Sequence, residues 1–513
     1  MKRNAGYRFS TMMLATVLVS CGFPMIMQPT RAAVNEIRLE IDDIIRQKPL
    51  STNDSTFGVC YLPPDPSRTH ARGLNWRRID CHWSTVEPSD DAWTWGSYDA
   101  DVQQSEANNI YQIVLLCYGN DAITGAGGKY VPPAFLDEWG EYVSEVVRRY
   151  RGNETIIAYE VWNEANVEGF WKGSAEDYAR LLIKSSEVIR SEDPDALILC
   201  TGTASSLQSN LGPNEVFYSR LLEWNQSHLE FKGKIDFDVY NVHAYLNNPM
   251  QYRELIRRQK QVCREYNFPW RPDPDSPRFQ DRFSRIWVTE IGFGGNSSSP
   301  RELNRQQQKT IKAATIGYFE NLGHHLIYQW KWDETWVIEG KPVMDAIATT
   351  FPIWKNSTPF ESFSHVNDFP FKYNPFNLFA ARTHDGLLAI AYWDQQEQGY
   401  KFDVSLDAII SSVDKIVLPN FTWPYSEFSN PAGMSNDRGR IQDIVVEHDF
   451  QMLLVNSSTM VDSIIITTHL NARAVVIYYL IPGLLVVVMG MIVARLVRRM
   501  KIDAPREAIK DQA

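Results

Sequence analysis

The sequence predicts an α/β protein: a (β/α)₈ TIM barrel, followed by a small antiparallel β-sandwich domain and one C-terminal transmembrane helix. Three observations predict this order. Apolar strand-like runs alternate with amphipathic helical stretches between about residues 55 and 355. Short alternating runs replace this pattern after about residue 372, and an uncharged apolar run lies near the C-terminus. At 513 residues the chain is also too long for one ordinary core.

The barrel is predicted from eight strand-like runs separated by helical patterns. The runs occupy residues 57–63, 76–83, 110–120, 156–164, 196–203, 237–245, 285–293 and 325–333. Parallel strands need crossover helices, so this alternation fits a closed barrel over 55–355. An open doubly wound sheet is the competing fold, but it requires a glycine-rich turn after an early strand, which this sequence lacks.

The C-terminal part reads as a β domain followed by a membrane anchor. Runs such as GLLAIAYWD and FQMLLV predict a small β-sandwich over 372–456. Residues 474–494 carry no charge and reach about 32 Å as a helix, enough to cross a bilayer. Arginines follow at once, so the tail over 495–513 is predicted to be cytoplasmic. A buried soluble helix is the alternative reading.

The N-terminus predicts export. Basic residues precede an apolar stretch and small residues follow it, which is the layout of a signal peptide over 1–32. The sequence LVSC, ending at Cys21, allows a second reading, a lipidated cysteine. Together with the C-terminal helix, a signal peptide predicts a large extracytoplasmic domain on a single-pass anchor.

Composition narrows the class of partner. The net charge of −11 argues against a nucleic-acid ligand. The chain holds 16 Trp, 23 Tyr and 24 Phe, which either fill the core or stack on flat ligands such as sugars. The cysteines show no close pairing and lie mostly in apolar runs, so we expect free core thiols. Neither a metal site nor a cofactor site is predicted.

Polar and aromatic residues gather where the predicted barrel strands end. They are Arg78, Asp80, His82, Asn163, Glu164, His243, Tyr245, Glu290, Trp330 and Trp332. In a barrel these ends meet on one face, where active sites lie. The sequence therefore predicts a site at this face.

Two glutamates in this set predict acetal hydrolysis. Such a reaction needs one carboxyl group that is protonated and one that is ionised, which Glu164 and Glu290 can supply. Asn163 can bind a sugar hydroxyl and Trp330 can stack under a ring. Arg78 and Tyr245, named above, can hold one carboxylate ionised.

Each supporting residue also has a structural reading. Arg78 and Asp80 can form an ion pair that only stabilises the fold, and His243 can be a satisfied core histidine. Glu160 shares strand parity with Glu164 but lies one pleat deeper, so we expect a buried, paired residue of the barrel wall.

These segments resemble known enzymes. YEVWNEAN (159–166) and VTEIGFGG (288–295) are similar to the Asn-Glu and nucleophile signatures of the retaining (β/α)₈ glycoside hydrolases, clan A. YNVHAY (240–245) resembles the clan's His-x-Tyr segment, and the region around Arg78 resembles its second strand. Within the clan the chain is most similar to glycoside hydrolase family 39 and to endoglycosidases encoded with bacterial exopolysaccharide machinery.

The resemblance implies roles for the site residues. Glu164 would be the acid/base and Glu290 the nucleophile, with Asn163 on the 2-hydroxyl. Arg78 and Tyr245 would support the nucleophile, His243 would line the site and Trp330 would stack, all without a metal or cofactor. One departure is Ala165, where clan members commonly have proline.

The resulting hypothesis is a retaining glycosidase that cuts β-linkages inside a polysaccharide outside the cytoplasm. An exo-acting, β-xylosidase-like enzyme is the near alternative. A non-catalytic carbohydrate-binding or assembly protein on the same scaffold is the alternative from another class.

Overall fold

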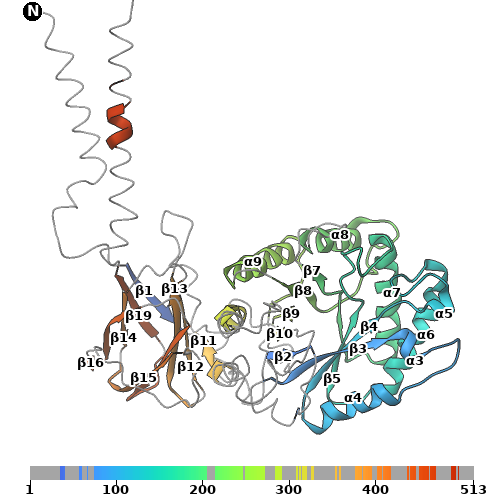
Figure 1. The fold of residues 1–513 in the computed structure, drawn as a ribbon, viewed down its shortest axis with the longest axis horizontal. Coiled ribbons are helices and arrows are strands. Elements are labelled where there is room, and N and C mark those ends of the chain that lie inside the picture. The colour runs from blue at the N-terminus through green and yellow to red at the C-terminus, as the bar shows by residue number, and fades with distance from the viewer. Residues whose placement is uncertain are drawn as a thin grey trace, which may run out of the picture.

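The computed structural model describes residues 35–40, 57–60, 66, 74–204, 214–245, 249–271, 284–291, 308–309, 311–313, 315–319, 325–327, 353–354, 357–359, 376–383, 385–394, 401–406, 408–417, 436–437, 439–445, 450–461, 463–469, 487–492 and 495. These residues form one parallel sheet with helices around it and two antiparallel sheets (Figure 1).

The parallel sheet is a closed barrel. Its strands are β2 (Phe57–Val59), β3 (Trp76–His82), β4 (Tyr111–Cys117), β5 (Ile156–Val161), β6 (Leu197–Leu199), β7 (Thr203–Ala204), β8 (Tyr240–Ala244), β9 (Ile286–Ile291) and β10 (His325–Ile327). Their order is β6-β5-β4-β3-β2-β10-β9-β8-β7. The predicted strand 196–203 is split into β6 and β7. The first and the last strand in this order therefore come from the same segment of chain. Bridges from Leu199 to Val239 and from Asn163 to Gly202 complete the ring. The predicted barrel is confirmed, and the open sheet is excluded.

Amphipathic helices cover the outside of the barrel. The longer ones are α4 (Gly96–Ala107), α6 (Leu136–Tyr150), α7 (Ala175–Glu192), α8 (Asn214–Ser227) and α9 (Pro249–Glu265). In α6 the buried side chains Trp139, Val143, Val146 and Val147 recur at helical spacing and face the sheet. Acidic residues in its first turn and arginines in its last suit the helix dipole.

The C-terminal part forms two antiparallel five-stranded sheets, ordered β1-β19-β14-β17-β16 and β11-β12-β13-β18-β15. Their strands are β1 (Asn35–Glu40), β11 (Thr358–Pro359), β12 (Phe376–Arg382), β13 (Leu388–Asp394), β14 (Lys401–Leu406), β15 (Ile410–Val417), β16 (Asn436–Asp437), β17 (Arg440–Val445), β18 (Gln451–Ser457) and β19 (Ser463–His469). Buried side chains of both sheets, such as Ile390 and Ile464, belong to one apolar cluster. In β13 successive side chains alternate between this cluster and the cluster of the barrel core, so both faces of the strand are buried.

These sheets extend beyond the predicted range of 372–456. Strand β19 lies between the predicted sandwich, which ends at 456, and the predicted membrane helix, which begins at 474. Strand β1 pairs with it, from Asn35 opposite Thr468 to Glu40 opposite Ser463. No local pattern reveals this pairing, because the two partners lie at opposite ends of the chain.

The barrel and the antiparallel sheets are in direct contact. The Phe379 ring of β12 lies 5.1 Å from the Phe319 ring, and the Arg253 guanidinium of α9 lies 5.6 Å over it. The Phe450 amide donates to Gln308 Oε1 at 2.8 Å. The buried rings of this contact belong to the same apolar cluster as the barrel core.

The predicted membrane helix and signal peptide lie largely outside the described residues. Of 474–494 only 487–492 are described, as a short helix with exposed side chains. Among the residues that the structure describes, no helix combines the length and the apolar character needed to span a bilayer.

Candidate active site

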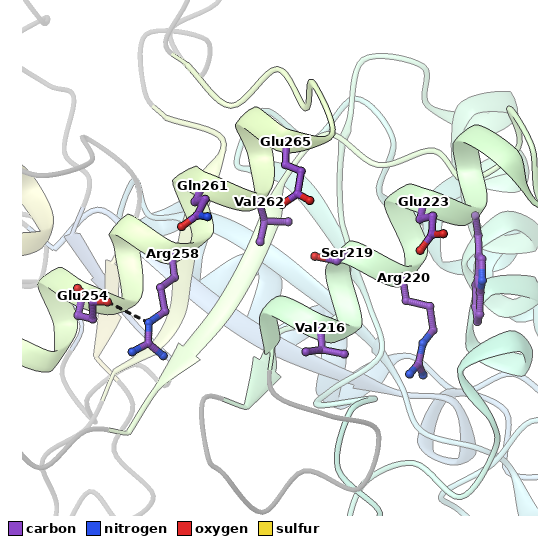
Figure 2. Close-up of a pocket in the computed structure, with 10 residues that line it drawn as sticks. Val216, Ser219, Arg220, Glu223, Glu254, Arg258, Gln261, Val262 and Glu265 are labelled. Atoms are coloured by element: carbon purple, nitrogen blue, oxygen red, sulfur yellow. Dashed lines mark hydrogen bonds and ion pairs between the residues drawn. The ribbon is translucent and has the colours of Figure 1, made fainter.

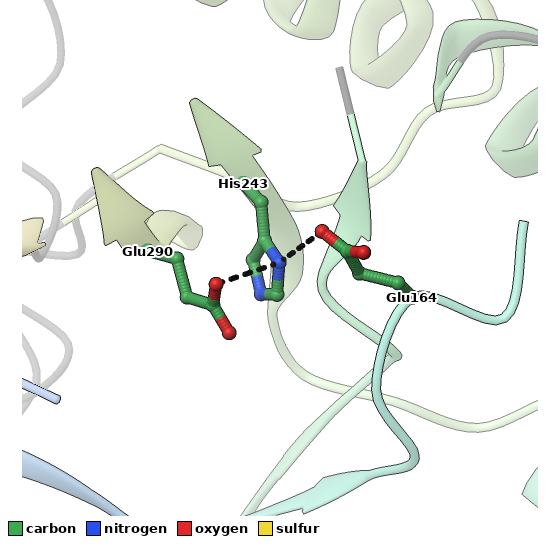
Figure 3. A group of neighbouring side chains, drawn as sticks. All are labelled: Glu164, His243 and Glu290. Atoms are coloured by element: carbon green, nitrogen blue, oxygen red, sulfur yellow. Dashed lines mark hydrogen bonds and ion pairs between the residues drawn. The ribbon is translucent and has the colours of Figure 1, made fainter. Parts of the chain in front are cut away.

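Four barrel strands bring the predicted site together, three of them at or near their carboxyl ends. Glu164 follows β5, Glu290 lies near the end of β9, and His243 lies near the end of β8 (Figure 3). Arg78 comes from the middle of β3. All four are buried. Residues far apart in sequence therefore form one cluster, as the strand-end pattern predicts.

His243 stands between the two glutamates. Its Nδ1 lies 2.9 Å from Glu164 Oε1 and 3.5 Å from Glu290 Oε2 (Figure 3). One ligand atom from each of the three residues lies within 4.8 Å of the others. Burial lowers the pKa of His243, so the ring is neutral and carries one N–H. Because Nδ1 faces the carboxyl oxygens, we assign the hydrogen to Nδ1.

Glu290 is held as a carboxylate by two donors. Arg78 Nη1 donates to Oε1 at 2.8 Å, and the Tyr245 hydroxyl donates to Oε2 at 2.5 Å. A guanidinium always carries its charge, so this pair favours the ionised form of Glu290. Both oxygens of Glu290 have a partner before any substrate arrives.

The two glutamates differ in charge. Burial raises the pKa of Glu164 from its ordinary value of 4.5 to about 7, opposed only by the more distant charge of Arg78. Burial and the neighbouring charge of Glu164 also raise the pKa of Glu290 above its ordinary value, and His243, Arg78 and the Tyr245 hydroxyl oppose this rise without cancelling it. The guanidinium binds Glu290 directly, so the negative charge of the pair stays on Glu290 and the proton on Glu164.

Comparison with known proteins decides the family. The profile of the cellulase family, glycosyl hydrolase family 5, matches residues 67–335. The chain belongs to this family.

Other known proteins are similar to parts of the chain or share its fold. A β-xylosidase of Caldicellulosiruptor saccharolyticus is 32% identical over 95 residues, which are 17% of this chain and 20% of the relative. A family 39 glycoside hydrolase of Bacteroides cellulosilyticus WH2 shares the fold with a TM-score of 0.57 at 18% identity, covering 79% of this chain and 82% of that one. A glucosidase of Croceicoccus marinus gives 0.50 at 11% identity, with 83% and 97% covered.

The protein is therefore a retaining glycosidase of clan A, as the sequence predicts. The matching family profile is that of family 5, while the similarity to family 39 is one of fold. The β-xylosidase match spans only a fifth of that protein, so its activity does not transfer directly.

A strained turn presents Glu164 of this glycosidase. Trp162 and Glu164 have φ angles of 69° and 44°, in the left-handed region that bulky residues rarely adopt. The Glu164 amide donates to the Gly202 carbonyl at 3.1 Å, and the Ala165 amide donates to Thr201 Oγ1 at 3.1 Å. A proline at 165 would have no N–H for the second bond. Alanine at this position therefore fits the turn.

Glu160 is a buried, paired residue of the barrel wall, as expected. It accepts two hydrogen bonds from Arg78, at 2.7 and 3.0 Å, and one from the Gly202 amide at 2.9 Å. Arg78 thereby bridges the wall and Glu290. The ion pairs of Arg78 are thus with Glu160 and Glu290, which makes it part of the site, while Asp80 lies 3.8 Å from His82.

Asn163 and Tyr118 complete the described cluster. Asn163 Oδ1 accepts from Arg78 Nη2 at 2.9 Å, and its Nδ2 donates to the Tyr118 hydroxyl at 3.1 Å. Tyr118 was not among the predicted site residues. It directly follows the apolar run of β4, so the rule applied to the other strand ends could have found it. Trp330 lies outside the described residues.

Glu164, His243 and Glu290 are residue types that bind cations. Arg78 and Tyr245, however, already occupy both oxygens of Glu290, and the guanidinium places a positive charge beside them. The cluster therefore suits a pair of carboxyl groups better than a metal centre.

A separate groove lies between α8 and α9, on the outside of the barrel (Figure 2). Charged side chains such as Arg220, Glu223 and Arg258 line it. The described lining residues include none of the predicted site residues, so this groove is distinct from the cluster.

Proposed function

We propose that this glycosidase cleaves β-linkages inside a polysaccharide by double displacement, with Glu164 as acid/base and Glu290 as nucleophile. The observation that carries the proposal is the unequal partnering of two neighbouring carboxyl groups, of which Glu290 binds the Arg78 guanidinium and Glu164 lies against the neutral ring of His243. Glu164 has a pKa of about 7, whereas Glu290 binds Arg78 at 2.8 Å. Retaining enzymes place these groups about 5–5.5 Å apart, and the short distance between one oxygen of Glu164 and one of Glu290, at most 4.8 Å, supports a retaining geometry.

The proposed chemistry proceeds in two steps. Glu164 gives its proton to the glycosidic oxygen while a Glu290 oxygen attacks the anomeric carbon, so the leaving sugar departs and an ester forms. Water then attacks the same carbon, gives its proton to Glu164 and releases Glu290. Two inversions leave the β configuration unchanged.

Supporting residues act on charge and position. Arg78 and Tyr245 keep Glu290 ionised before it attacks. As the attacking oxygen bonds to the anomeric carbon, the carboxylate loses its negative charge and its hydrogen bond to the donor on that oxygen weakens. His243 donates to Glu164 and orients its carboxyl group. Asn163 binds the 2-hydroxyl, and Trp330 stacks on a sugar ring.

Azide rescue separates the two roles. In a Glu290→Ala variant, azide replaces the nucleophile and yields a glycosyl azide of inverted configuration. In Glu164→Ala, azide attacks the ester from the solvent side and yields the retained configuration. Aryl β-glycosides with good leaving groups serve as substrates, and Glu168→Ala, an exposed glutamate paired with Lys172, is the matched control. Unchanged activity of Glu290→Ala would refute the proposal.

Polymer products decide between cleavage inside a chain and cleavage from its end. The aromatic-rich composition and the proposed membrane tether favour internal cleavage of a polymer near a surface. The segment shared with a β-xylosidase favours the second candidate, release of single sugars. Xylan, mannan and glucan are incubated with enzyme: a fast drop in viscosity indicates internal cleavage, and monosaccharide without viscosity loss indicates end-wise cleavage.

We also propose export, with residues 1–32 as a signal peptide, 474–494 as the anchor and the C-terminal sheets as an accessory β-sandwich domain. Strand β1 begins at Asn35, so cleavage after residue 32 would leave it intact. Ending the chain at residue 473 should release active enzyme from the membrane fraction. If that shortened enzyme stays in the membrane fraction, lipidation at Cys21 becomes the better reading.

A further inference from the structure

The Asn163 side chain is fixed in one orientation. Arg78 offers only donors, so the Asn163 atom 2.9 Å from Nη2 must be the carbonyl oxygen. The amide nitrogen then faces the Tyr118 hydroxyl at 3.1 Å. Asn163 is 6% exposed, so little water competes for these bonds. One amide hydrogen goes to Tyr118, and the second is left for a ligand.

Tyr118 is itself held by two rings. Its ring lies edge-on to Trp162 at 5.5 Å and to His82 at 5.4 Å. Trp162 is anchored by its indole N–H, which donates to the Phe170 carbonyl at 3.1 Å. The phenol oxygen therefore has a defined place beside the Asn163 amide.

We propose that Tyr118 is a positioning residue for the bond between Asn163 and the 2-hydroxyl of the sugar, an inference that rests on the proposed function. The Tyr118 oxygen accepts one amide hydrogen and thereby aims the other at the sugar. Hydrogen bonds to the 2-hydroxyl strengthen in the transition state of glycoside hydrolysis. Loss of the phenol oxygen should therefore lower kcat more than it raises KM.

The Tyr118→Phe variant tests this role with little change in packing. It keeps the ring and its contacts with Trp162 and His82, and it removes only the oxygen. Leaving one amide hydrogen of Asn163 without its acceptor should lower kcat on aryl β-glycosides by about tenfold. Tyr130→Phe is the matched control, because that hydroxyl contacts Asp177 at 3.2 Å, away from the cluster.

Substrates that lack the 2-hydroxyl provide the decisive comparison. On 2-deoxy aryl glycosides, Tyr118→Phe and Asn163→Ala should both approach the wild-type rate measured on the same substrate. An equal loss on parent and 2-deoxy substrates would show a packing role and overturn the proposal. No loss on either substrate would also overturn it.

The parallel Glu290→Ala assay keeps the two proposals separate. If Glu290→Ala is inactive while Tyr118→Phe shows no dependence on the 2-hydroxyl, only the role of Tyr118 is refuted. If Glu290→Ala is active, the proposed function itself fails.

Discussion

Glu164 keeps a proton because it lies in a buried site whose guanidinium binds the other glutamate. Burial disfavours the ionised form of Glu164, so the folded protein loses stability when this proton leaves. Burial raises the pKa of Glu164 from 4.5 to about 7, so the folded protein holds a proton that the unfolded chain releases over this range. The free energy of unfolding contributed by this group is fully present below pH 4.5 and is lost as pH rises through about 7.

A Glu164→Gln variant should therefore gain stability relative to the wild type as pH rises. The rise in pKa corresponds to a gain of about 3 kcal/mol between pH 4 and 8. Urea unfolding at several pH values measures it, with Glu168→Gln as the exposed control. Parallel stability curves for wild type and Glu164→Gln would contradict the assigned proton.

Gly202 is required by the close approach of His243. A Cβ at this position would lie 2.1 Å from His243 Nε2 and 3.0 Å from Glu160 Oε1. Gly202→Ala should push His243 away from Glu164, lower kcat and cost about 1–3 kcal/mol of stability. Gly96→Ala is the control, because a Cβ added there would meet no atom of the described residues within 4 Å. Steady-state kinetics and thermal unfolding compare Gly202→Ala with Gly96→Ala. Equal kcat and equal stability of the two variants would refute the requirement for glycine at position 202.

At the scale of elements, the break between β6 and β7 shapes the site. Thr201 and Gly202 lie in this break, and their polar atoms bind the turn after β5. Gly202 still pairs with Asn163 across this break, and the Thr201 hydroxyl accepts from the Ala165 amide. Residues in the break between β6 and β7 thus hold the turn that carries Glu164.

Thr201→Val should loosen this turn. It leaves the buried Ala165 amide without its acceptor, at a cost of about 1–3 kcal/mol. Thr203→Val is the matched control, since the Asn241 carbonyl that Thr203 contacts also accepts from Tyr218 at 2.8 Å. Urea unfolding and the pH profile of kcat are compared. A similar loss in both variants would argue against a specific role for Thr201.

The sequence predicts the ends of the barrel strands, but it does not predict the break between β6 and β7. Strand-end residues could be predicted because each strand carries its own apolar run and the barrel brings the ends together. The break in 196–203 could not, since its residues are apolar or small and the reason for it lies in β5. The contact between Asn163 and Tyr118 likewise joins two strands, so neither strand reveals it alone.

For the whole molecule, the antiparallel sheets depend on a strand from the start of the chain. The barrel was predictable from its alternating pattern, whereas β1 lies before the barrel and pairs after it. Local periodicity gives no register between such distant segments.

Removing β1 tests its contribution. A chain that begins at residue 41 should lose about 3 kcal/mol and expose an edge of β19, relative to one that begins at residue 34. Both chains end at residue 473, so the proposed anchor does not interfere. Thermal unfolding and light scattering are the measurements, and identical midpoints would show that β1 is dispensable.

Strand β19 lies between β1 and β14, antiparallel to both, in continuous register with each. A force applied at His469 along the axis of β19 would run parallel to this strand. Ladder hydrogen bonds are perpendicular to strands, so both ladders would be loaded in shear and would share the force. A protein pulled at His469 should therefore resist at this sheet.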